Sequence, residues 1–153
     1  MEPDKTAITG NEPPYTADGP RAALSEFYRA FNGRDLDGVL ANWDDDDGIA
    51  MDNPLGGIKR GRKEIAEVYA RIFSGPAKVH VEFYDYTIHE TDGMFYAVGR
   101  ERGSFVKGDV SIELAIRTSR IFRLIGNRWR QVHHHGSIEN PQLLEKYQRA
   151  VAG

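Results

Sequence analysis

The second half of the chain is dominated by four consecutive segments of β-branched and aromatic residues. They span 78–90, 94–106, 110–124 and 129–138, and this composition is typical of strands. Asp92-Gly93, Gly108-Asp109 and Gly126-Asn127 separate them, and such dipeptides form tight turns between antiparallel neighbours. The chain must therefore build one antiparallel sheet, and the other segments must cover it.

The first half instead has helical periodicity, with apolar residues at i, i+3, i+4 and i+7. One helix follows Pro20, a second starts after a capping Asp35, a third starts at Gly61, and a last one starts at Pro141. A short strand is expected at 49–54, and the following LGGIKRGRK is expected to be a loop. Helices grouped before strands predict an α+β domain with helices packed on one face of an antiparallel sheet.

Length and composition limit the possible classes. The 153 residues suit one domain, which we place at 20–153, after a polar leader at 1–19 that we expect to be flexible. A net charge of −3 argues against a nucleic-acid binder, and the absence of cysteine excludes disulfides and thiolate chemistry. No apolar run approaches membrane-spanning length. We therefore expect a cytoplasmic protein that binds neither nucleic acid nor membrane.

Both faces of the predicted strands carry apolar side chains. In 79–88, Val79, Val81 and Phe83 alternate with Tyr84, Tyr86 and Ile88. The helices can cover one face only, and a solvated face would be more polar. We therefore predict a homodimer through the outer sheet face; partial cover by the last helix or the leader is the alternative.

The order of elements resembles the nuclear-transport-factor-2-like superfamily, which includes SnoaL-like cyclases and ketosteroid isomerases. The segment NWDDDDGIAMDNPLGGIKRGRKEI is similar to the family's passage from helix through first strand to next helix. The pattern R-x-F-x(6)-W-x-x-V-H-x-H, from Arg120 to His135, is similar to the association-domain hairpin of calcium/calmodulin-dependent protein kinase two. The resemblance implies a cystatin-like cone, a curved antiparallel sheet with helices on its concave face.

Arg120 interrupts an apolar strand face, because the even positions of its strand read Val, Ile, Leu, Ile, Thr, Arg, Phe, Leu. A buried guanidinium needs a partner. That partner is either an internal carboxylate, Asp52 or Glu101, or the oxyanion of a ligand. The association-domain resemblance implies a pocket for small carboxylates at Arg120.

The run His133-His134-His135 alternates between strand faces, so the three side chains cannot bind one ion together. His133 and His135 share a face, but no carboxylate stands in an obvious position to complete a site, so we expect no metal and no cofactor. A two-residue turn at Gly126-Asn127 would pair Arg120 with His133, and a three-residue turn would place it beside His134. The resemblance favours the second, with Val132 and His134 facing inward and His133 and His135 at the subunit interface.

The resemblance and these residues together imply two functional hypotheses. In the first, the domain is an acid–base enzyme of isomerase, cyclase or hydratase type that acts on a small apolar carbonyl or carboxylate compound. Arg120 would stabilise an oxyanion, and Asp52 or His134 would move the proton. In the second, the domain is a non-catalytic dimeric module for ligand binding or association. Aromatic residues that would line the pocket, unless they only fill the core, are Trp43, Tyr69, Phe73 and Tyr86.

Overall fold

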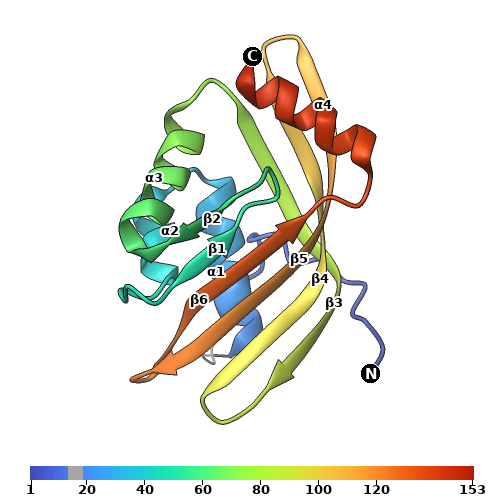
Figure 1. Cartoon of the computed structure of the whole chain (residues 1–153). Coiled ribbons are helices and arrows are strands. Elements are labelled where there is room, and N and C mark those ends of the chain that lie inside the picture. The colour runs from blue at the N-terminus through green and yellow to red at the C-terminus, as the bar shows by residue number, and fades with distance from the viewer. Residues whose placement is uncertain (14–18) are drawn as a thin grey trace.

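The computed structural model describes residues 1–13 and 19–153, and the helices begin and end close to the predicted residues (Figure 1). They are α1 (Pro20–Asn32), α2 (Leu36–Asn42), α3 (Gly61–Ser74) and α4 (Pro141–Ala152). The Asp35 side chain caps α2 by accepting the Gly38 N–H at 3.0 Å. Among the described residues, none of the helices has the length and apolarity needed to cross a membrane.

The strands form a six-stranded sheet in the order β2-β1-β6-β5-β4-β3. The four long strands were predicted, and they are β3 (Lys78–Glu90), β4 (Met94–Lys107), β5 (Val110–Ile125) and β6 (Arg128–Ser137). The first strand, β1 (Ala50–Asp52), is shorter than expected, and β2 (Ile58–Arg60) lies where we expected a loop. The sheet is not purely antiparallel, because β1 runs parallel to β6.

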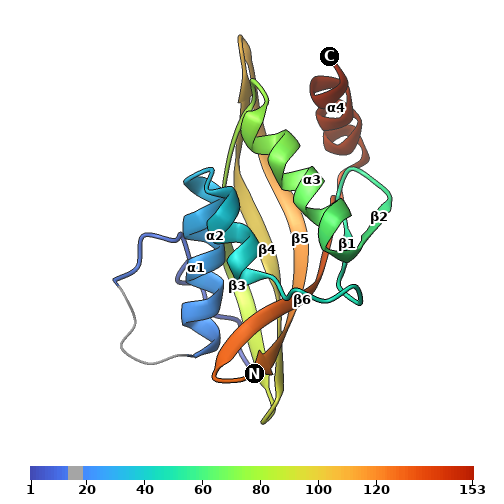
Figure 2. The same cartoon turned by 90° about the vertical axis from the view of Figure 1, so that its left-hand side faces the viewer.

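The sheet is curved, and the helices cover its concave face (Figures 1 and 2). Bulges bend it in β3 at Asp85, whose φ is +52°, and in β6 opposite Ile121 and Phe122. At Gly103 a Cβ atom would lie 1.8 Å from the His80 carbonyl oxygen, so only glycine permits this approach of β4 to β3. Helices α1–α3 lie together, whereas α4 lies near the β4–β5 hairpin.

Aromatic side chains join α1 to the inner face of the sheet. Phe27 and Tyr28 of α1 are almost fully buried, and the Tyr28 ring stacks on Phe83 of β3 with a centroid distance of 5.8 Å. Phe95 of β4 stacks on Phe122 of β5 at 4.6 Å. Fully burying one such side chain contributes about 1.5–3 kcal/mol to folding, so this layer holds the helices on the sheet.

Residues 1–13 do not form the flexible leader that we expected, because they pair with the outer edge of β3. Asp4 bridges Tyr86 and Ile8 bridges Phe83, through backbone N–H···O distances between 2.7 and 3.2 Å. Ile8 is only 2% exposed, so it adds to the core. The polar composition of this segment did not indicate that Ile8 would be buried, or that the exposed edge of β3 would pair with the segment. The expectation for residues 14–18 lies outside the described residues.

Candidate functional site

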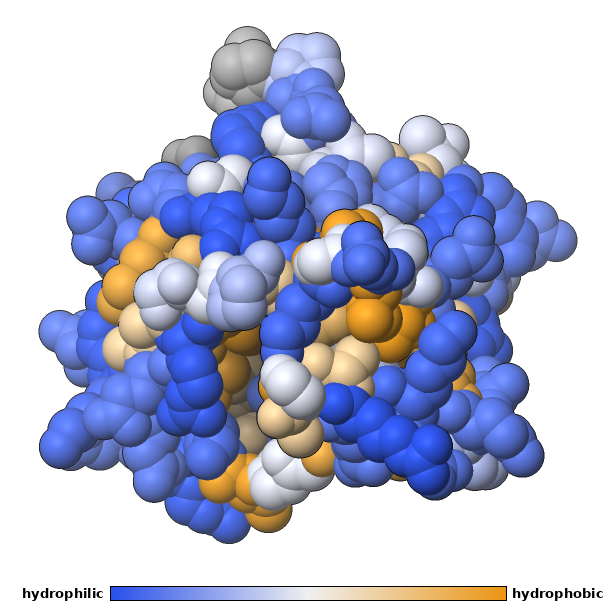
Figure 3. Space-filling view, turned by 90° about the horizontal axis from the view of Figure 1, so that it is seen from above, coloured by the Kyte–Doolittle hydropathy of each residue, from blue (hydrophilic) through white to orange (hydrophobic). Residues whose placement is uncertain are grey.

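A cavity of about 470 Å³ lies between the concave face of the sheet and helices α1, α3 and α4. Its walls are mostly apolar and include Phe27, Phe31, Met51, Val68, Leu114 and Ile116. Seen from above, the molecule shows apolar side chains recessed among hydrophilic ones (Figure 3). Three buried polar side chains of the sheet line this apolar space: Glu101 from β4, Arg120 from β5 and His134 from β6. The less buried Lys59, Arg71 and Lys107 are also among its lining residues. A few converging polar groups in an apolar cavity are typical of a small-molecule site.

Arg120 is 2% exposed, and side chains from three elements accept its hydrogen bonds. Its Nη2 donates to Glu101 Oε2 at 3.0 Å, its Nη1 to Gln131 Oε1 at 2.7 Å, and its Nε to the Tyr28 hydroxyl at 3.2 Å. The guanidinium carbon lies 3.9 Å from the centre of the Phe27 ring, within cation–π range. Of the partners that we considered, Glu101 is therefore the internal carboxylate and Asp52 is not.

The Glu101 carboxylate likewise accepts hydrogen bonds from three buried side chains. Its two oxygens accept from the Tyr28 hydroxyl at 2.7 Å and the Thr118 hydroxyl at 3.0 Å, in addition to Arg120. Burial would lower the pKa of Arg120, but the neighbouring Tyr28 and Glu101 raise it, so the guanidinium stays charged. The floor of the cavity thus holds a fixed ion pair whose charges sum to zero.

His134 is a buried polar group of the cavity lining. It is 6% exposed, and within the described residues neither of its ring nitrogens makes a hydrogen bond. Burial lowers its pKa well below the usual value, and the positive charge of Arg120 lowers it further. The imidazole is therefore neutral near pH 7, with one N–H donor and one acceptor available to a ligand.

The register that places His134 beside Arg120 comes from a bulge and not from a longer turn. Gly126 and Asn127 form a two-residue turn, which by itself would pair Arg120 with His133. The bulge at Val132 shifts β6 by one residue, so that Arg120 faces His134. The prediction that His134 lies beside Arg120 is confirmed, but the three-residue turn that we gave as its cause is wrong. The bulged residue is the half-buried Val132.

Comparison with known proteins agrees with this architecture. The profile of the SnoaL-like domain matches residues 21–141. The chain belongs to the SnoaL-like family. No curated protein matches the chain, but many solved structures do.

Among these structures is a candidate calcium/calmodulin-dependent protein kinase type II association domain from Thiobacillus denitrificans. It is 28% identical, with a TM-score of 0.67, over 84% of this chain and 100% of the other. A ketosteroid isomerase-like protein from Erwinia carotovora atroseptica is 23% identical, with a TM-score of 0.64, over 78% and 93%. A protein with a cystatin-like fold from Caulobacter vibrioides is 18% identical, with a TM-score of 0.65, over 87% and 95%. These similarities support the cystatin-like fold that we predicted.

Asp52 does not join Arg120 and His134 in this SnoaL-like domain. Side chains alternate along β1, so Met51 lines the cavity and Asp52 projects from the opposite face of the sheet. There the Asp52 carboxylate accepts a hydrogen bond from His135 Nδ1 at 2.6 Å. Our prediction that Asp52 acts in the same site as Arg120 therefore has no geometric support.

Of the four aromatic residues predicted to line the pocket, only Tyr69 is among the described residues that surround the cavity. Trp43 is completely buried, and half-buried Phe73 packs against Phe31 and Tyr69. Tyr86 stacks on Phe83, and its hydroxyl bonds to Arg21 and Asp4 near a separate, more open hollow. None of these three residues lines this cavity, so the structure gives no support to their predicted role as its walls.

Sequence reasoning missed Tyr28 as part of the polar floor and Tyr147 as a residue of the cavity lining. Tyr28 links Arg120 to Glu101, and burial raises the pKa of Tyr147 to about 12, so its cavity-lining hydroxyl stays protonated. Both lie at helical core spacing, where a tyrosine cannot be distinguished from a packing residue. Glu101 did give a signal, since it stands at an inward position of β4 in register with Phe95 and Phe105.

Proposed function

We propose that this SnoaL-like domain binds a small, mostly apolar molecule whose polar oxygen lies at His134. The observation that carries the proposal is the buried imidazole at the floor of the cavity, which has no hydrogen-bond partner among the described residues. A buried polar group without a partner costs about 1–3 kcal/mol, and a ligand that supplies the bond recovers this energy on binding. The cavity volume of about 470 Å³ suits a molecule of drug-like size or smaller.

The charges at the floor of the cavity favour a neutral ligand oxygen there, while the less buried Lys59, Arg71 and Lys107 also line the cavity. The positive charge of Arg120 is already balanced by Glu101 at 3.0 Å, so an incoming carboxylate gains little from the floor and meets the Glu101 charge. A neutral carbonyl or hydroxyl oxygen meets no such repulsion and can accept the His134 N–H. We therefore favour a carbonyl compound over a carboxylate as the ligand of the floor.

Acid–base catalysis is the second candidate function of the same groups. A carbonyl oxygen that becomes negative during proton abstraction would be stabilised by the neutral His134 donor and the nearby Arg120 charge. Glu101 is the carboxylate of the described cavity lining, and it would have to accept the proton. The three hydrogen bonds that already occupy Glu101 instead favour the alternative function, a binding module without turnover.

Matched ligands and variants test the proposal. Wild type, His134→Leu and His80→Gln are screened by thermal shift against pairs of small molecules that differ only in an aldehyde, ketone or carboxylate group. His80 is exposed on β3 and serves as the control. We expect stabilisation of wild type and the control by carbonyl compounds, and its loss in His134→Leu. Equal stabilisation of all three proteins, or none of wild type, would contradict the proposal.

Turnover separates the two functions. A ligand that shifts the wild type is incubated with the protein in deuterated water, and exchange at the carbon next to the carbonyl is followed by NMR. Catalysed exchange that disappears in His134→Leu supports the enzyme. Saturable binding without exchange supports the binding module.

We also propose that the domain is a homodimer through the outer face of β4 and β5. Tyr96 and Val98 of β4 are 39% and 44% exposed, and Tyr96 stacks on His89 of β3. Half-buried Ile121 of β5 pairs with Tyr96. Apolar and aromatic side chains that face outward from the centre of a sheet are typical of an interface.

A further inference from the structure

A second group of chemically active side chains lies on the outer face of the sheet, away from the cavity. Asp52 of β1 and His133 and His135 of β6 each place one ligand-type atom within 4.8 Å of those of the others. We propose that these three residues form a binding site for a divalent transition-metal ion such as Zn²⁺. The site goes beyond the proposed function, because it lies on the opposite face of the sheet from His134.

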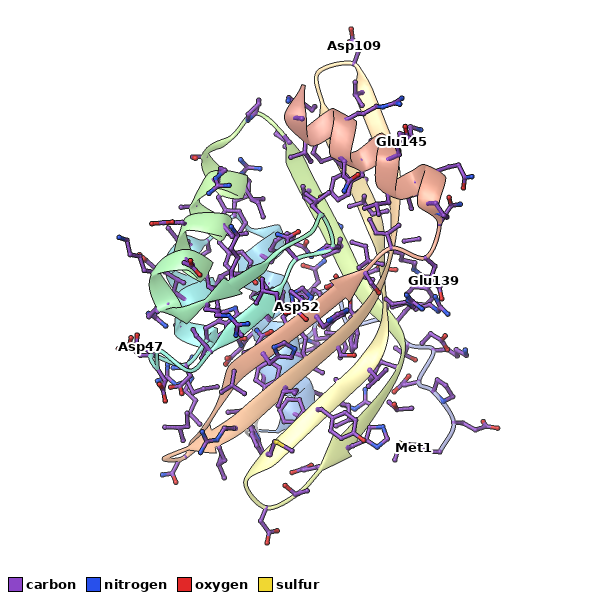
Figure 4. The ribbon with its side chains drawn as sticks, viewed as in Figure 1. Met1, Asp47, Asp52, Asp109, Glu139 and Glu145 are labelled. Carbon is purple, nitrogen blue, oxygen red and sulfur yellow. The ribbon has the colours of Figure 1, made fainter. Side chains whose placement is uncertain are left out.

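The strand register builds the site. Residues two apart on a strand share a face, so His133 and His135 project together. The parallel pairing of β1 with β6 sets Ala50 beside His133 and Asp52 beside His135. Figure 4 labels Asp52, which lies alongside β6. The carboxylate that the sequence did not place beside the two histidines is thus supplied by a strand about eighty residues earlier.

Backbone contacts orient one histidine for metal binding. His133 Nδ1 lies 3.0 Å from the Ala50 carbonyl oxygen. A carbonyl oxygen only accepts, so Nδ1 carries the proton and Nε2 keeps its lone pair for an ion. Histidines that bind metal ions usually donate their other ring N–H to a carbonyl or carboxylate oxygen in this way, which fixes the tautomer and the ring orientation.

Asp52 and His135 are already in contact and have room to adjust. His135 Nδ1 lies 2.6 Å from Asp52 Oδ2, and the two side chains are 51% and 30% exposed. Transfer of the Nδ1 proton to Nε2 leaves a ring nitrogen and a carboxylate oxygen facing each other, and a cation can occupy the position between them. Their exposure allows the small rotation that this requires and gives the ion access from solvent.

The donor set selects the metal. Two imidazoles and one carboxylate suit Zn²⁺, Ni²⁺, Co²⁺ or Cu²⁺, whereas Ca²⁺ and Mg²⁺ require mainly oxygen ligands. With three protein ligands, at least one coordination position remains for water.

Metal titration of chelator-treated protein tests the proposal. Zn²⁺ binding is measured by calorimetry, and Co²⁺ binding by its visible absorption. The proteins are wild type, Asp52→Asn, His133→Gln, His135→Gln and, as control, His80→Gln, an exposed histidine of the far strand β3. Thermal melting in chelator checks that every variant folds.

We expect wild type and His80→Gln to bind one ion per chain, and each of the other variants to bind at least about tenfold more weakly, because replacing even an outer-shell partner costs 10–100-fold. Co²⁺ absorption should weaken in parallel, and excess Mg²⁺ should not compete. Wild type that binds no Zn²⁺ saturably, or binding that persists in all three cluster variants, would overturn the proposal.

Discussion

Removing the charge of Glu101 is the sharpest test of how the cavity floor is held. Glu101→Gln keeps the size of the side chain but leaves the 2% exposed Arg120 guanidinium without its counter-ion. The substitution also replaces one of the two carboxylate oxygens that accept hydrogen bonds from the Tyr28 and Thr118 hydroxyls. Breaking a buried pair by neutralising one partner costs about 3–5 kcal/mol, so we expect a loss of that size in the free energy of unfolding.

The neighbouring strand offers a matched control. Glu82 of β3 accepts from Arg102 Nε at 2.7 Å, but these side chains are 27% and 51% exposed. An exposed pair contributes about 0–1 kcal/mol, so Glu82→Gln should change stability little. Both variants are unfolded in urea at one protein concentration and followed by circular dichroism.

A double variant shows whether the loss comes from the pairing. Replacing Arg120 and Glu101 together by Met and Leu removes both charges, and such apolar replacements are often neutral or stabilising. We therefore expect the double variant to be more stable than Glu101→Gln. If Glu101→Gln costs no more than Glu82→Gln, the view of the floor as a tightly held ion pair is refuted.

Two further predictions concern His134 and the outer face. His134 stays neutral in the folded protein because its pKa is lowered, whereas in the unfolded chain it titrates near 6.5. Its contribution to stability is therefore present above about pH 6.5 and is lost as the pH falls toward the folded pKa. The free energy of unfolding should fall by up to about 1.4 kcal/mol per pH unit in this range. Urea unfolding between about pH 5 and 7.5 should show a flatter profile for His134→Leu than for wild type, and equal slopes would contradict the lowered pKa. Val98→Lys should convert the proposed homodimer to a monomer, as measured by sedimentation. It should not change the melting temperature of the domain measured at high dilution. An unchanged mass of the variant, or a monomeric wild type, would contradict the interface.

Periodicity predicted the elements well because their cause is local. The α1 stripe, the Asp35 cap of α2 and the Gly-containing turns between the long strands each depend on a few neighbouring residues. The burial of Arg120 was also predictable, since it interrupts an inward-facing apolar row.

What the sequence concealed depends on contacts between distant segments. The parallel pairing of β1 with β6 is set by the packing of the whole domain, and it moved Asp52 from the predicted pocket to the outer face. The bulge at Val132 leaves no composition signal, yet it decides which histidine faces Arg120. Ile8 likewise looked like one apolar residue in a polar segment until β3 offered it an edge.

Strand alternation allows β6 to serve two sites independently. His134 projects into the cavity, while its neighbours His133 and His135 project to the face that carries Asp52. His134→Leu should therefore abolish the carbonyl response and leave Zn²⁺ binding intact, and His135→Gln should do the opposite. If either substitution removes both responses, β6 itself has lost its register, because a slip of one residue exchanges the two faces. Paired measurements on these two variants thus separate failure of a site from failure of the strand.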